Sequence, residues 1–216
     1  MKNLRLLLQL LCCLSLAVGA GAAQPIKIAC VGDSITEGAG VDNAVVNAYP
    51  IVLGRLLGTN YQTRNFGLSG TTMLKHGDVP YWVATQFKGA TNYQPDVVTI
   101  KLGTNDSKPQ NWRYKDQFAD DLRAMIAIFQ GLPSHPKVWL CLPVPAYAVN
   151  FDINPGIIKN EIIPIIKQVA KEKGLPTIDL YTTLSGRPDL FPDNIHPNAA
   201  GAAIIAKTIH GALISK

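Results

Sequence analysis

The chain has 216 residues, of which 47% are hydrophobic and 16% are charged, and this balance excludes an intrinsically disordered protein. The length fits one domain, or two small ones. Lys and Arg number 20 and Asp and Glu number 15, which gives a formal net charge of +5 without any block of consecutive basic residues. The charge pattern therefore excludes nucleic acid as an expected partner.

The N-terminus has the pattern of a secretory signal peptide. Lys2 and Arg5 are followed by a mostly apolar stretch at residues 6–18 and by the small residues 20–22, which suit a signal peptidase. The apolar stretch is shorter than the roughly 20 residues that span a bilayer. Bulky leucines before Cys12 disfavour a lipoprotein signal.

We therefore expect residues 1–22 to be removed as a signal peptide and residues 23–216 to form a single domain. The mature chain is expected to be exported to the periplasm or the medium, by a bacterium, without stable insertion into a membrane. Cys30 and Cys141 are the two cysteines that would remain. Both lie in apolar runs, so we predict that they are buried and unpaired.

Short apolar runs bounded by glycine or proline predict strands, and segments with apolar residues on one helical face predict helices. The predicted strands are residues 26–31, 61–66, 96–102, 137–142 and 177–180. The predicted helices are residues 49–57, 114–129, 157–173 (with a kink at Pro164) and 198–214. This alternation predicts an α/β fold with a parallel sheet, helices on both faces and right-handed crossovers.

Polar segments stand where a parallel sheet of this kind places its binding site, outside the carboxyl ends of the strands. Residues 32–36, 65–70 and 103–106 follow the first three predicted strands. Residues 193–197 precede the last predicted helix. We expect these four segments to meet at one edge of the sheet.

The four segments contain the groups that a serine nucleophile needs. Such a nucleophile requires a base to accept its proton, a carboxylate to orient the base, and donors for the developing oxyanion. Ser34 can be the nucleophile, His196 the base and Asp193 the carboxylate. The backbone of Gly70 and the side-chain amide of Asn105 can supply the donors.

From Ile26 to the final helix, these segments resemble the four sequence blocks of the SGNH hydrolases, also called GDSL-type esterases and lipases. Thr36 stands where the α/β-hydrolases have the second glycine of Gly-x-Ser-x-Gly, so that family fits less well. Ile35 replaces the leucine of the name-giving motif, which is a volume-conserving change. The resemblance implies a flavodoxin-like three-layer sandwich with five parallel strands in the order 2-1-3-4-5.

The resemblance also implies a role for each matching residue. Ser34 corresponds to the nucleophile, and Asp193 and His196 correspond to the Asp-x-x-His block that completes the triad. The oxyanion hole would consist of the backbone N–H groups of Ser34 and Gly70 and the side chain of Asn105. No cofactor and no metal are implied, because the histidines and cysteines lack metal-ligand spacing.

The sequence around the four blocks resembles that of secreted bacterial carbohydrate acetylesterases, including sialate O-acetylesterase-like proteins. We therefore expect a serine esterase that removes short acyl groups, above all O-acetyl groups of carbohydrates, through an acyl-enzyme. Its partner would be a small-molecule or glycan ester. Two alternatives stay open: a lysophospholipase or thioesterase acting on longer acyl chains, and a non-catalytic glycan-binding module.

Loop composition favours the short acyl group. The segments 75–78 and 107–112, which follow two of the blocks, are polar or aromatic and supply no apolar groove for a long chain. Aromatic residues near these loops are candidates for a sugar platform, although many such residues only pack the loops. They are Tyr81, Trp82, Trp112, Tyr114 and Tyr147.

Overall fold

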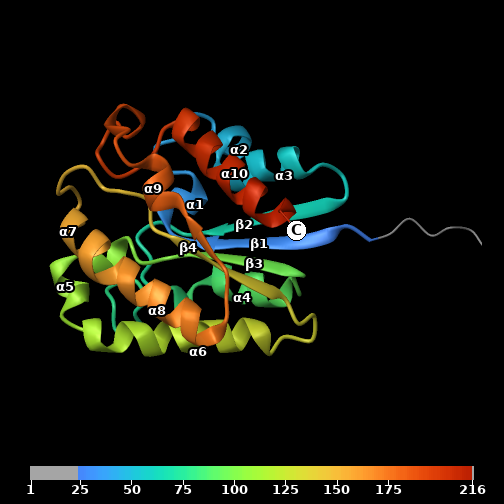
Figure 1. Ribbon diagram of the computed structural model, residues 1–216, viewed down its shortest axis with the longest axis horizontal. Coiled ribbons are helices and arrows are strands. Elements are labelled where there is room, and N and C mark those ends of the chain that lie inside the picture. The colour runs from blue at the N-terminus through green and yellow to red at the C-terminus, as the bar shows by residue number, and fades with distance from the viewer. Residues whose placement is uncertain (1–23, 216) are drawn as a thin grey trace, which may run out of the picture.

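A five-stranded parallel sheet forms the centre of the computed structural model, which describes residues 24–215 (Figure 1). The strand order is β2-β1-β3-β4-β5, which confirms the predicted fold class and topology. The strands are Ile26–Gly32 (β1), Tyr61–Gly67 (β2), Val97–Lys101 (β3), Lys137–Leu142 (β4) and Thr177–Asp179 (β5). The predicted signal peptide lies outside the described residues.

Helices cover both faces of the sheet, with α3 and α10 on one side and α4, α6 and α8 on the other (Figure 1). These long helices are Tyr49–Leu57 (α3), Thr85–Asn92 (α4), Phe118–Gln130 (α6), Ile163–Lys173 (α8) and Ala199–Ile214 (α10). The short helices are Ser34–Glu37 (α1), Ala44–Asn47 (α2), Pro109–Trp112 (α5), Pro155–Ile157 (α7) and Leu180–Leu184 (α9). Single turns are Tyr81–Val83 (η1), Asn105–Ser107 (η2), Lys115–Gln117 (η3), Ile158–Ile162 (η4) and Pro188–Leu190 (η5).

The alternation of side chains along β1 explains why the strand is continuously apolar from Ile28 to Val31. Ala29 and Val31 face the helices α4, α6 and α8, whereas Ile28 and Cys30 face α3 and α10. All four side chains are fully buried. A central parallel strand needs apolar residues on both faces because helices cover both.

Two predicted helices differ in detail from the structure. Residues 115–117 form a separate 3-10 turn, so α6 begins at Phe118 rather than at residue 114. The predicted kink near Pro164 takes the form of the π-helical turn η4, directly before α8. Pro164 has no backbone N–H to donate to the carbonyl of Asn160, so the regular ladder is interrupted there.

Helix α4 was not predicted from the sequence, although a crossover between β2 and β3 requires a connection of that kind. Its sequence is polar and contains Gly89, so it lacks an apolar periodicity that would reveal a helix. Among residues 24–215, no helix combines the length and the apolar character needed to cross a bilayer.

Cys30 and Cys141 are both free and buried, as the sequence predicted. They lie on β1 and β4, which β3 separates in the sheet. Burial raises the pKa of each thiol from 9.0 to about 12. A thiol of that pKa is almost entirely protonated near neutral pH and does not attack disulfides.

We therefore predict that Ellman's reagent does not react with the folded chain 23–216 and titrates two thiols per chain after denaturation. Rapid reaction of the native protein would contradict the burial of both cysteines. A mass lower by two hydrogens without reductant would contradict their unpaired state.

Candidate active site

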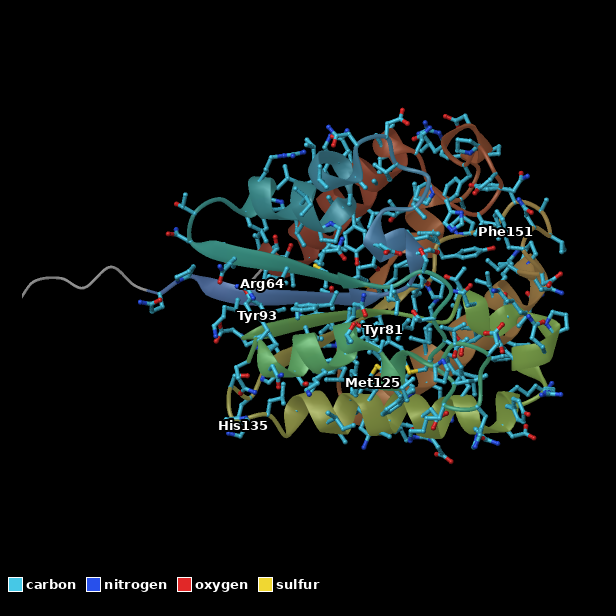
Figure 2. The ribbon with its side chains drawn as sticks, turned by 180° about the vertical axis from the view of Figure 1, so that it is seen from behind. Arg64, Tyr81, Tyr93, Met125, His135 and Phe151 are labelled. Atoms are coloured by element: carbon cyan, nitrogen blue, oxygen red, sulfur yellow. The ribbon has the colours of Figure 1, made fainter. Side chains whose placement is uncertain are left out.

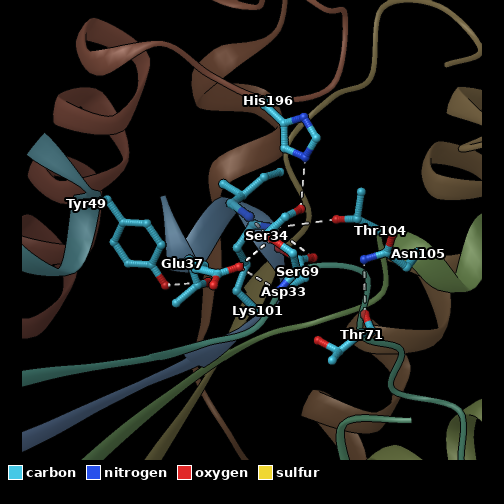
Figure 3. A network of polar contacts seen from close by, with 12 residues as sticks. Asp33, Ser34, Glu37, Tyr49, Ser69, Thr71, Lys101, Thr104, Asn105 and His196 are labelled. Carbon is cyan, nitrogen blue, oxygen red and sulfur yellow. Dashed lines mark hydrogen bonds and ion pairs between the residues drawn. The ribbon is translucent and has the colours of Figure 1, made fainter. Parts of the chain in front are cut away.

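Ser34 lies just beyond the carboxyl end of the interior strand β1, as the first residue of the short helix α1. Asp33 caps this helix, because its Oδ1 accepts a hydrogen bond from the N–H of Ile35 at 3.1 Å. The hydroxyl of Ser34 is thus left free of a capping role. Its Oγ lies 2.9 Å from Nε2 of His196 (Figure 3).

Asp193 fixes the orientation of the His196 ring. Its Oδ2 lies 2.7 Å from Nδ1 of His196, and its Oδ1 accepts the backbone N–H groups of Ile195 and His196 at 2.9 and 2.7 Å. Burial opposes ionisation of Asp193, but the hydrogen bonds from His196 and Ile195 outweigh it and lower the pKa below its ordinary value. The carboxylate therefore stays charged and can stabilise an imidazolium.

The candidate oxyanion donors line the same cavity as Ser34 and His196. This cavity has a volume of about 210 Å³, and Gly70 and Asn105 lie in its wall. One N–H of the Asn105 amide donates to the carbonyl of Thr71 at 3.1 Å (Figure 3). Because an amide has two such donors, this contact orients the group and leaves the second N–H for a ligand.

Two carboxylates that the sequence did not single out as anchors hold the turn around Gly70. Glu37 accepts both the backbone N–H of Ser69, at 2.7 Å, and its hydroxyl (Figure 3). Asp106 accepts the N–H groups of Met73 and Leu74 at 3.0 and 2.8 Å. Burial raises the pKa of Asp106 to about 7, although these hydrogen bonds lower it in part. The turn is thus anchored on both sides of Gly70.

A buried ion pair lies directly beneath the nucleophile. Nζ of Lys101 contacts both carboxylate oxygens of Asp33, at 3.0 and 3.2 Å, and both side chains are fully buried (Figure 3). The same ammonium group lies 3.5 Å from Oγ1 of Thr104, next to Asn105. It therefore connects the segment that carries Ser34 to the segment that carries Asn105. The sequence feature that could have indicated this pair is a lysine at the end of a strand that carries no other charge.

The structure does not place the proposed aromatic platform residues in the cavity. Tyr81, Trp82, Trp112, Tyr114 and Tyr147 are all absent from its described lining. Tyr81 and Trp112 are buried, and they use their polar atoms on Phe66 and Glu161 instead. Phe151 lines the cavity, with its ring centroid 5.7 Å from that of His196.

The polar loops considered in the sequence contribute little to the cavity. Of the two segments 75–78 and 107–112, only Lys108 appears in its described lining. Lys75 and His76 instead contact Asp121 and Gln117. No group of three or more His, Cys, Asp or Glu side chains in residues 24–215 is arranged to hold a metal ion.

The amino-acid sequence of the chain is similar to those of known proteins. Residues 30–204 match the model of the GDSL-like Lipase/Acylhydrolase family. The chain is 40% identical to an acetylxylan esterase of Xylanibacter ruminicola, over 91% of this chain and 45% of that protein. It therefore spans about half the length of this curated relative.

Solved structures share the fold. The acetyl xylan esterase AlAXEase has a TM-score of 0.64 and 23% identity, over 88% of this chain and all of that one (100%). Est24, a carbohydrate acetylesterase from Sinorhizobium meliloti, has a TM-score of 0.70 and 19% identity, over 87% and 98% of the two chains. At these identities, the likeness shows a common fold.

Proposed function

The chain belongs to the GDSL-like lipase/acylhydrolase family, and on this basis we propose that it is a serine esterase that removes acetyl groups from carbohydrates. The observation that carries the proposal is the continuous hydrogen-bonded series from Ser34 through His196 to Asp193, which opens on a small cavity. The 40% identity to an acetylxylan esterase supports the choice of substrate.

In this proposal, Ser34 is the nucleophile and His196 is the base. Nε2 of His196 accepts the hydroxyl proton while Oγ bonds to the ester carbonyl carbon, and the imidazolium then protonates the departing sugar oxygen. Water next attacks the carbonyl carbon of the acetyl-enzyme and gives a proton to His196. The imidazolium then returns this proton to Oγ of Ser34 as the bond between Oγ and the carbonyl carbon breaks and acetate leaves. Asp193 holds the tautomer that keeps Nε2 available.

The negative charge that forms on the carbonyl oxygen would be bound by the N–H groups of Ser34 and Gly70 and by the amide of Asn105. Gly70 has a φ of 81°, a region that favours glycine over other residues. Anchoring of its turn by Glu37 and Asp106 supports this role. Donors held in place before the reaction stabilise the oxyanion without having to reorganise.

Replacing Asn105 with alanine is expected to lower kcat by about 10²–10³, the usual loss for one oxyanion donor. The KM should change less, because the donor acts on charge that develops in the transition state. Steady-state kinetics on an acetyl ester measure both constants. A reduction below about threefold would assign Asn105 a structural role through its bond to Thr71.

The size of the cavity favours an acetyl group over a long acyl chain. Its volume of about 210 Å³ is below the 300–1,000 Å³ typical of sites for larger ligands. A longer chain would gain about 0.8 kcal/mol for each CH₂ only if an apolar surface buried it. The volume of the cavity therefore does not favour the lipolytic alternative.

The experiment for this function compares acyl groups and substrates directly. We expect a higher kcat/KM on p-nitrophenyl acetate than on p-nitrophenyl octanoate, and release of acetate from acetylated xylan or another acetylated glycan. An octanoyl preference of about tenfold or more, equal to roughly 1.4 kcal/mol, without acetate release from any glycan, would favour the lipolytic alternative. Binding of glycans without turnover of any ester would indicate a binding module.

We further propose that the protein acts outside the cytoplasm of a bacterium, after removal of residues 1–22. The basic and apolar pattern of this segment supports the proposal. The mass of the protein recovered from the periplasm or the medium tests it. A mature chain that still contained residues 1–22 would contradict cleavage.

A further inference from the structure

Phe151 differs from the other large apolar side chains around the cavity because it is largely in water. Its side chain is 55% exposed, whereas Ile153, two residues later, is buried. Both residues line the cavity that contains Ser34. Figure 2 shows Phe151 at the end of the molecule where the strands have their carboxyl ends. A single exposed apolar residue is ordinary by itself, and Phe151 is distinguished by lining the cavity that contains Ser34 and His196 as well.

The backbone of this segment adopts an unfavourable conformation. Phe151 and Asp152 have φ values of 51° and 62°, in the left-handed region that residues other than glycine rarely adopt. Such conformations persist only where surrounding contacts enforce them, and they occur preferentially at functional sites. Two consecutive residues of this kind turn the chain so that the Phe151 ring stands at the opening of the cavity.

The contacts that enforce this turn connect it to the proposed catalytic residues. The side chain of Asn150 accepts the N–H of Phe151 at 2.9 Å and donates to the carbonyl of Asp193 at 2.9 Å. At the end of the turn, the N–H of Asn154 donates to Oγ of Ser107 at 3.0 Å. The segment 150–154 is thus attached both to the loop of His196 and to the loop of Asn105.

The Phe151 ring is therefore held next to the reacting ester. Its centroid lies 5.7 Å from that of His196, with the two planes tilted by 59°. Nε2 of the same imidazole contacts Oγ of Ser34. The carbonyl carbon of the ester must lie next to this Oγ, because Oγ attacks it. The alcohol part of the ester leaves toward His196, which protonates it, so the alcohol part and not the acyl part comes close to this ring.

We propose that Phe151 is the platform on which the acetylated sugar ring stacks, and that it determines the preference for carbohydrate esters over simple esters. This inference rests on the proposed carbohydrate acetylesterase activity. The face of an aromatic ring carries partial negative charge and attracts the polarised C–H groups of a sugar ring, while it also buries the apolar face of that ring. A platform held in place before binding loses little conformational entropy when the sugar arrives.

The test compares Phe151→Ala with Phe151→Tyr on acetylated xylo-oligosaccharides and on triacetin, an acetyl ester without a ring. Val149→Ala is the matched control, because Val149 is 68% exposed in the same loop and is absent from the described lining of the cavity. Initial rates give kcat and KM for each pair. Calorimetry in the Ser34→Ala background measures binding of the oligosaccharide without turnover.

We expect Phe151→Ala to raise KM and Kd for the oligosaccharide about tenfold, as for loss of one aromatic contact, and to leave kcat within about twofold. The KM for triacetin should rise much less than the KM for the oligosaccharide, Phe151→Tyr should restore oligosaccharide binding, and Val149→Ala should behave like the parent protein. These results together support the platform.

Unchanged oligosaccharide binding in Phe151→Ala would overturn the inference while leaving the proposed function intact. An equal loss of kcat/KM on triacetin would also overturn it, because Phe151 would then act by positioning His196. A parent protein that hydrolyses triacetin but no acetylated glycan would instead refute the proposed function, and the platform with it.

Discussion

Replacing Ser34 with alanine is expected to leave the protein folded and to lower kcat on p-nitrophenyl acetate by on the order of 10⁶, as in other serine hydrolases that lose the nucleophile. The residual rate reflects binding and the oxyanion donors, which remain in place. The hydroxyl of Ser34 accepts no capping hydrogen bond of α1, since Asp33 performs that function. The free energy of unfolding should therefore change little.

Labelling by a fluorophosphonate provides a second measurement for the same residue. The parent protein should gain one label on the peptide that contains Ser34, and Ser34→Ala should gain none. Ser185→Ala is the matched control, because Ser185 is exposed and its hydroxyl contacts only the carbonyl of Tyr181 in the structure. Substantial turnover by Ser34→Ala would contradict the proposed mechanism.

Replacing Lys101 with methionine is expected to lower the free energy of unfolding by about 3–5 kcal/mol, the usual result of removing one partner of a buried ion pair. The carboxylate of Asp33 would then be buried without a compensating charge, and it would keep the hydrogen bond from the N–H of Ile35. Because Asp33 caps the helix that begins with Ser34, we also expect lower activity. Urea denaturation followed by circular dichroism measures the stability.

The double variant Asp33→Asn/Lys101→Met distinguishes an unpaired charge from a lost packing contact. It removes both charges and keeps a side-chain oxygen that can cap α1, so it should regain most of the lost stability. Lys137→Met is the matched control, because Lys137 also lies on a strand but is exposed, and it should change stability by less than about 0.5 kcal/mol. If the single variant Lys101→Met were as stable as the parent protein, the ion pair between Lys101 and Asp33 would not stabilise the fold as we expect.

Much of the fold could be predicted from the sequence because its determinants are local. A continuous apolar run such as residues 28–31 of β1 indicates a strand buried on both faces, and glycine or proline marks the ends of such strands. The helix α4 escaped prediction because its residues are polar and it is held by its position between β2 and β3. Its existence follows from the connection that two parallel strands require.

The sequence by itself indicated a parallel sheet with helices on both faces and identified Ser34, Asp193 and His196 as candidates, because polar segments follow strands whose carboxyl ends share one edge. The strand order followed from the resemblance to the SGNH hydrolases, and the structure confirms it. Only the tertiary structure decided which other side chains meet them. The Lys101–Asp33 pair depends on the register of β1 and β3, and the exposure of Phe151 depends on the path of a loop anchored to Asp193 and Ser107. Contacts between residues far apart in the chain leave no local pattern, and for that reason the sequence did not indicate that Phe151, rather than the five aromatic candidates, lines the cavity.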